Sequence, residues 1–157
     1  ISAVDLIKGI GFYAGMDVVN VPGATGLYDT NYEGKADYAL KSLKTHDFVF
    51  VHVEAPDEAG HAGKIELKIK TIENFDQRLL GRILRALGND DFRLAILPDH
   101  PTPIKVRTHT SDPVPFLIYS PNEEGDGIKK FDEFSVEAGS LGTVSGSDFL
   151  KLLFSKR

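Results

Sequence analysis

Residues 48–61 read FVFVHVEAPDEAGH, an apolar run that passes into an acidic stretch ending in histidine. The run over residues 48–54 predicts a strand buried on both faces, as in parallel sheets covered by helices. Asp57 and His61 follow it, four positions apart. Because α/β proteins place their chemistry just beyond the ends of their strands, we expect both side chains to belong to a functional site.

The rest of the chain alternates between helical and strand-like patterns. Apolar residues at three- and four-residue steps predict two long helices, over residues 31–45 and 64–87. Thr30 and Glu33 predict a capping box at the start of the first helix. Shorter patterns predict helices near residues 5–10 and 145–153 and strands over residues 17–21, 92–97 and 114–119. This alternation predicts an α/β fold with a mostly parallel open sheet and helices on both faces.

Composition narrows the class of protein. The chain has 157 residues, enough for one domain, and its formal net charge is -5. It has no basic stretch, so we expect neither a nucleic-acid partner nor an acidic membrane surface, and no apolar run approaches the roughly 18 residues that span a bilayer. Without cysteine, a metal must be held by nitrogen and oxygen ligands. The opening at Ile1 has no initiator methionine and no signal-peptide layout, so we expect a piece of a longer protein, although a processed or trimmed chain would look the same.

Further acidic and imidazole side chains follow the later strands. Asp99 and His100 come directly after the run at residues 92–97, and His109 lies in the loop beyond. In a parallel sheet these loops open at the same edge, so all five candidate residues are expected to converge. Two carboxylates and three imidazoles suit divalent transition metals. The alternative, that each is a turn former, a helix cap or a surface residue, stays open at this point.

Two further histidines are interpreted without a metal. His46 is expected to be a solvated loop residue, and His52 a core histidine with its hydrogen bonds satisfied. Two histidines and one aspartate around an ion leave an open coordination position, as catalytic sites require. A pair such as Asp99 and His100 needs additional ligands from elsewhere to hold a second ion. Two ions about 3.5–4 Å apart suit phosphoryl transfer, because they stabilise the attacking and leaving oxygens together.

The order Asp-x-x-x-His, Asp-His and a single His resembles the alkaline phosphatase superfamily. The local sequence around these residues is closer still to that of the archaeal-type, cofactor-independent phosphoglycerate mutases within the superfamily. Segments at residues 51–61, 97–103 and 109–116 read VHVEAPDEAGH, LPDHPTP and HTSDPVPF. Segments at residues 1–9 and 23–32, ISAVDLIKG and GATGLYDTNY, are similar to that family too. The resemblance covers essentially the whole chain.

The resemblance implies a set of roles. Asp57, His61 and His109 would hold one metal ion, and Asp99 with His100 would hold part of a second. The implied cofactors are two divalent ions, from manganese, magnesium, zinc or cobalt. The implied reaction is the isomerisation of 2-phosphoglycerate and 3-phosphoglycerate through a phosphoserine, in cytoplasmic glycolysis and gluconeogenesis. One metal would activate the serine, and the ions with basic groups would bind the phosphate.

The chain also departs from the family. There, the nucleophilic serine, a further metal-binding aspartate and most basic substrate-binding residues precede the region matched here. No serine of this chain matches the nucleophile, so we assign no catalytic residue. We interpret residues 1–157 as the C-terminal part of the metalloenzyme domain, inactive alone. Such a piece would expose apolar sheet surface and form a homo-oligomer.

Two other function classes remain as alternatives. A phosphate- or sulfate-ester hydrolase of the same superfamily would share the ligand pattern. Only the sequence similarity around residues 54–56 and 101–103 favours the mutase. A metal-binding module without catalysis is the third class.

Overall fold

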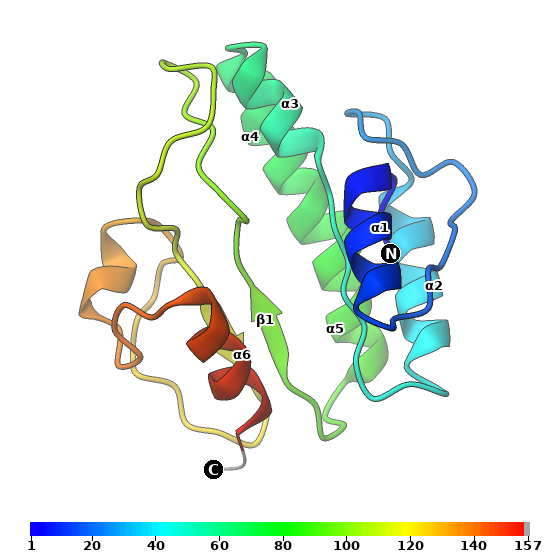
Figure 1. Ribbon diagram of the computed structural model, residues 1–157. Helices are drawn as coiled ribbons and strands as arrows, with labels where there is room; N and C mark the ends of the chain where they lie inside the picture. Colours follow the sequence, from blue (N-terminus) through cyan, green and yellow to red (C-terminus); the bar gives the residue numbers. More distant parts are fainter. Residues whose placement is uncertain (156–157) are drawn as a thin grey trace. The chain divides into compact units, whose positions relative to one another are not determined.

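The computed structural model describes residues 1–155, and it has an α/β fold in which helices predominate over two short strands (Figure 1). The chain divides into two compact units. The first contains Ile1–Gly88 and Thr102–His109, and the second contains Asn89–Pro101 and the residues from Thr110 onward. Within the described residues, no helix is both long enough and apolar enough to cross a membrane.

A continuous helical segment is the longest element of the first unit. Helix α4 (Ile65–Asn74), the π-helix η1 (Phe75–Leu80) and helix α5 (Gly81–Leu87) follow one another without a break (Figure 1). They confirm the helix predicted over residues 64–87. Leu79 and Ile83 from this segment are buried in the core. Gly88 ends the helix with a φ of 56°, a conformation that is open to glycine at little cost.

Helix α2 (Tyr32–Ser42) packs along η1 and α5 and confirms the helix predicted near residues 31–45. Tyr32, Ala36 and Ala39 bury its apolar side. Two bidentate ion pairs tie its outer side to the neighbouring helices. They join Arg78 to Glu33, at 2.6 and 2.9 Å, and Arg82 to Asp37, at 2.6 and 3.0 Å. Such paired geometry is the strongest form of a surface ion pair.

The predicted N-cap of this helix is wrong by one residue. Asn31, not Thr30, caps α2, because its side-chain oxygen accepts the Gly34 N–H at 2.8 Å. The Thr30 hydroxyl is buried and accepts the Thr25 N–H at 3.0 Å instead. The hydroxyl is therefore used by the preceding loop, an interaction that a local capping pattern does not reveal.

The predicted open parallel sheet is not what the described residues form. Their paired strands are β1 (Leu94–Ile96) and β2 (Leu117–Tyr119), and they are antiparallel, with Ala95 opposite Ile118. Both lie inside predicted strands, but residues 17–21 and 48–54 contain no strand. A strand requires a neighbour that supplies complementary N–H and C=O groups over several residues, and an apolar run alone does not determine that neighbour.

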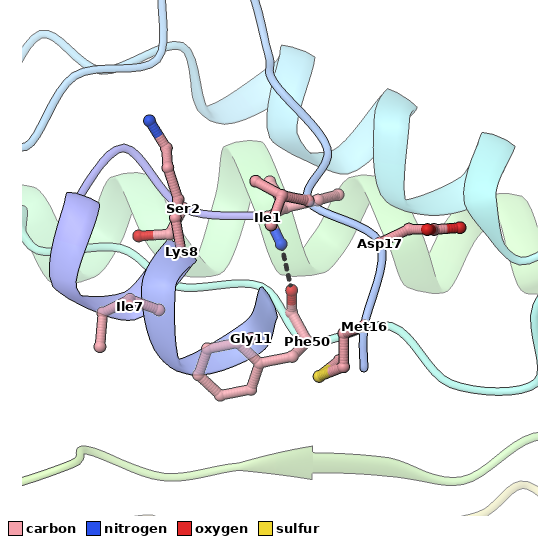
Figure 2. Close-up of a pocket in the computed structure, with 9 residues that line it drawn as sticks. Ile1, Ser2, Ile7, Lys8, Gly11, Met16, Asp17 and Phe50 are labelled. Carbon is pink, nitrogen blue, oxygen red and sulfur yellow. Dashed lines mark hydrogen bonds between the residues drawn. The ribbon is translucent and has the colours of Figure 1, made fainter. Parts of the chain in front are cut away.

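The apolar run at residues 48–53 is nevertheless extended and has one parallel contact. The Ile1 amine donates to the Phe50 carbonyl at 2.7 Å (Figure 2), and the His52 N–H donates to the Ile1 carbonyl at 2.9 Å. Bonds from one residue to the two neighbours of Val51 are the pattern of a parallel pair. The hollow beside this contact has a volume of about 30 Å³, room for a single water and not for a substrate.

Other helices complete the two units. Helix α1 (Asp5–Tyr13) and helix α3 (Ala55–His61) belong to the first. The second contains the 3-10 helix η2 (Ser135–Ala138) and helix α6 (Gly146–Phe154), the predicted closing helix. Arg93 donates to the carbonyls of Leu152, Leu153 and Ser155, at 3.1, 3.2 and 2.5 Å, and also contacts Glu123. These bonds satisfy carbonyls that the end of α6 leaves without a helical partner.

Lys35 on α2 is buried, with 1% of its surface exposed. Its ammonium donates to the His52 carbonyl at 2.9 Å and so ties α2 to the extended run. Burial lowers the pKa of Lys35 to about 8, partly opposed by the charge of Glu54. A buried ammonium can keep its charge when it is hydrogen-bonded and lies near a carboxylate, as this one does.

This lysine predicts a pH-dependent stability. The unfolded chain holds the proton up to about pH 10.5 but the folded chain releases it near 8, so the unfolded state binds more protons between these values and stability rises with pH there. We compare the free energy of unfolding of the wild-type chain with that of Lys35→Met. We expect the wild-type value minus the variant value to rise from pH 8 to 10.5 by on the order of 2 kcal/mol. Urea unfolding at a series of pH values measures it. A difference that stays flat or falls would contradict the burial of the ammonium.

Candidate metal centre

Helix α3 carries Asp57 and His61 on one face, because residues four positions apart on a helix are neighbours. The two residues were expected in a loop after a strand, and they lie instead on this short helix. Pro56 occupies its first turn, where a missing N–H is harmless and the fixed φ favours the helix. Asp57 and Glu58 add negative charge near the positive end of the helix dipole.

His109 joins this pair from the loop Thr102–His109. Its Nε2 lies 3.1 Å from Nε2 of His61 and 3.5 Å from Oδ1 of Asp57, while Nε2 of His61 lies 3.3 Å from Oδ2 of Asp57. Ligand atoms that share one tetrahedral ion at bond lengths of about 2.0–2.1 Å are about 3.3 Å apart. Each pair of side chains therefore approaches to about the spacing of one coordination shell, with Oδ2 of Asp57 nearer His61 and Oδ1 nearer His109.

The orientation of His61 is set by a backbone carbonyl. Its Nδ1 donates to the carbonyl of Arg107 at 3.0 Å, so Nδ1 carries the hydrogen and the lone pair of Nε2 is directed at Asp57 and His109. This is the arrangement by which proteins fix the tautomer of a metal-binding histidine.

The backbone around that carbonyl is unusual. Arg107 has a φ of 59°, the single positive φ at a non-glycine among the described residues. Such a conformation is strained and persists where the surrounding structure enforces it. Gly63, itself at a φ of 66°, makes room for the Arg107 side chain, because a Cβ at Gly63 would lie 2.8 Å from the Arg107 Cζ. The Arg107 side chain therefore lies against Gly63, two residues beyond the end of α3.

Asp99 and His100 belong to the second unit, where they contact each other. The Asp99 carboxylate accepts the His100 backbone N–H at 3.1 Å and lies 3.6 Å from its Nε2. Of the five predicted ligands, the structure thus brings three together in the first unit, and the role of the other two stays a prediction.

Sequence reasoning missed several members of this neighbourhood. Glu54 and Glu58 form a second cluster of possible ligands with Asp57, their carboxylate oxygens lying within 4.8 Å of one another. Their spacing of three and four positions on a helix was a usable signal. The Thr102 hydroxyl, which donates to Oδ1 of Asp57, and the Arg107 carbonyl carried no such signal, because both contacts are long-range.

The other two histidines lie outside these clusters. His46 is half-exposed and its Nε2 is 2.9 Å from a carboxylate oxygen of Asp17, which raises the pKa of His46. Nδ1 of the half-buried His52 is 3.2 Å from the Ser2 hydroxyl. Neither belongs to a group of possible metal ligands among the described residues.

Comparison with known proteins supports the resemblance seen in the sequence. The chain is 58% identical over 156 residues to the 2,3-bisphosphoglycerate-independent phosphoglycerate mutase of Methanosarcina acetivorans, covering 98% of this chain and 39% of the relative. It is 47% identical over 158 residues to a probable enzyme of the same name from Geobacter sulfurreducens, covering 99% of this chain and 40% of that relative. The solved structure of the PH0037 protein from Pyrococcus horikoshii matches with a TM-score of 0.94 at 38% identity, over 100% of this chain and 49% of that one.

These matches confirm the resemblance to archaeal-type mutases, although the chain spans only about two fifths of the length of its curated relatives. Residues 1–156 match the family described as the Metalloenzyme superfamily. The name of that family agrees with the aspartate and two histidines gathered beside α3. The chain belongs to the Metalloenzyme superfamily.

Proposed function

We propose that this chain is the metal-binding, C-terminal part of a 2,3-bisphosphoglycerate-independent phosphoglycerate mutase. The observation that carries the proposal is the cluster of Asp57, His61 and His109, in a chain that is 58% identical to a relative of that name. The whole enzyme interconverts 2- and 3-phosphoglycerate in cytoplasmic glycolysis and gluconeogenesis through a phosphoserine. The serine lies outside this chain, and phosphoglycerate is the ligand, with no nucleic-acid or membrane partner.

The superfamily implies divalent metal ions, and the residues present fit one. In our proposal Asp57, His61 and His109 hold one ion, and Asp99 with His100 contributes to a second. Support for the first comes from ligand atoms 3.1 to 3.5 Å apart and from a histidine whose tautomer leaves Nε2 available. Manganese, magnesium, zinc and cobalt are the candidate metals, since nitrogen and carboxylate ligands accept each of them.

The residues of this chain would do three things in the reaction. Asp57 supplies negative charge that offsets the charge of a cation. His61 and His109 bind through neutral nitrogens and leave coordination positions open. Helix α3 holds two of the three side chains on one rigid element. A bound divalent ion supplies the Lewis acidity that activates a hydroxyl nucleophile and stabilises phosphoryl oxygens.

We also propose that in the whole enzyme the extended run 48–53 is part of a larger, mostly parallel sheet with helices on both faces. The parallel hydrogen bonds around Val51 support this. Phe48 and Phe50 remain 38% and 44% exposed, and Leu6 and Phe12 on α1 are 71% and 69% exposed. Apolar surface of this kind favours association, so the chain alone should form a homo-oligomer.

The metal ligands predict a simple binding result. We expect His61→Ala and His109→Ala each to abolish tight Mn²⁺ binding by the chain in titration calorimetry, because two remaining ligands hold an ion weakly. His46→Ala is the matched control and should bind like wild type, since His46 contacts Asp17. Affinity of the wild-type chain should fall in acid, because protons compete for the imidazole nitrogens. Binding that survives both substitutions would exclude this centre.

Because our proposal places the nucleophilic serine outside this chain, we expect the 157-residue chain alone not to turn over 3-phosphoglycerate in an assay coupled to enolase. A complete enzyme that includes this chain should be active, and its Asp57→Asn variant should lose at least the roughly 10- to 100-fold in activity that removing an outer hydrogen-bond partner of a metal ligand costs. Turnover by the purified chain would refute the first expectation. A complete enzyme that cleaves a generic phosphomonoester but does not isomerise phosphoglycerate would instead be a hydrolase of the superfamily.

A further inference from the structure

Thr102 is a buried residue whose side chain reaches Asp57 across 45 positions of sequence. Only 4% of Thr102 is exposed, and its hydroxyl donates to Oδ1 of Asp57. A carboxylate turns easily about its last side-chain bond. A hydrogen bond to one of its oxygens therefore selects the direction in which the other points.

The backbone of Thr102 is itself held in place. The Lys68 ammonium on α4 donates to the Thr102 carbonyl at 2.7 Å. Gly60 on α3 permits the approach, because a Cβ there would lie 2.5 Å from that carbonyl oxygen and 3.0 Å from the Thr102 Cγ2. Pro101 and Pro103 restrict the chain on either side. Two helices and two prolines thus determine where the hydroxyl lies.

We propose that Thr102 is a positioning residue of the metal centre. Its hydroxyl holds Oδ1 of Asp57, the oxygen 3.5 Å from Nε2 of His109, and so fixes the carboxylate with Oδ2, 3.3 Å from Nε2 of His61, free to bind the cation. Lys68 supports it by fixing the loop. The proposal rests on the metal-binding function proposed above and adds to it the group that orients the one anionic ligand. Outer hydrogen-bond partners of this kind typically account for 10- to 100-fold in metal affinity.

The direct test compares variants of the chain in titrations with Mn²⁺ alone. Thr102→Val keeps the shape and removes the hydroxyl, and we expect Mn²⁺ to bind about 10- to 100-fold more weakly. Thr102→Ser keeps the hydroxyl and should restore most of the affinity. Thr71→Val is the matched control: Thr71 is 1% exposed, and its hydroxyl bonds the Lys68 carbonyl at 2.8 Å within its own helix. It should bind Mn²⁺ like wild type.

A second readout separates positioning from folding. The visible spectrum of bound Co²⁺ reports the ligands and their geometry, and we expect Thr102→Val to alter it while Thr71→Val does not. If Thr102→Val does not fold, Lys68→Met replaces it, with a smaller loss of Mn²⁺ affinity expected because only the loop anchor is removed. Wild-type affinity and an unchanged spectrum in the folded variant would overturn the role of Thr102 alone. Failure of the wild-type chain to bind Mn²⁺ or Co²⁺ would overturn the metal centre, and this inference with it.

Discussion

Hydrogen bonds between helix α3 and the loop Thr102–His109 are the constraint on which the site depends. The loop gives its Arg107 carbonyl to His61 and its Thr102 hydroxyl to Asp57. These bonds bring His109 to a histidine that is 48 positions away in the sequence. The loop belongs to the first unit although the residues on both sides of it belong to the second. Without the bonds to α3, His109 would no longer be held beside Asp57 and His61, and those two ligands are too few for a tight site.

Small residues on α3 allow this close packing. Ala55 and Ala59 have no exposed surface, and Gly60 leaves the space that the Thr102 carbonyl occupies. A helix of seven residues is not stable by itself in water. Its contacts with α4 and with the loop therefore determine whether the ligands are held in place. Placing ligands on a packed helix keeps them more precisely positioned than a mobile loop would.

The contrast between helices and sheet shows which predictions succeed. The helices near residues 31–45 and 64–87 were predicted correctly, because apolar periodicity is a local feature of the chain. The strand at residues 48–54 was not, because a strand is defined by its partner, and here Ile1 makes the one parallel contact described. The cap at Thr30 failed for a related reason: Asn31 is an equally good cap, and the loop before α2 uses the threonine hydroxyl.

The sequence by itself determined the chemistry available, namely the residue types and the spacing of Asp57 and His61. It also carried the family resemblance that the match to the Metalloenzyme superfamily confirms. The sequence also predicted that His109 joins them, and the structure brings the three together. Only the tertiary structure decided that the Nδ1 of His61 carries the hydrogen and that Thr102 contacts Asp57. These facts depend on the left-handed backbone of Arg107 and on the space left by Gly60. Both are consequences of long-range packing, which a local pattern of residues does not record.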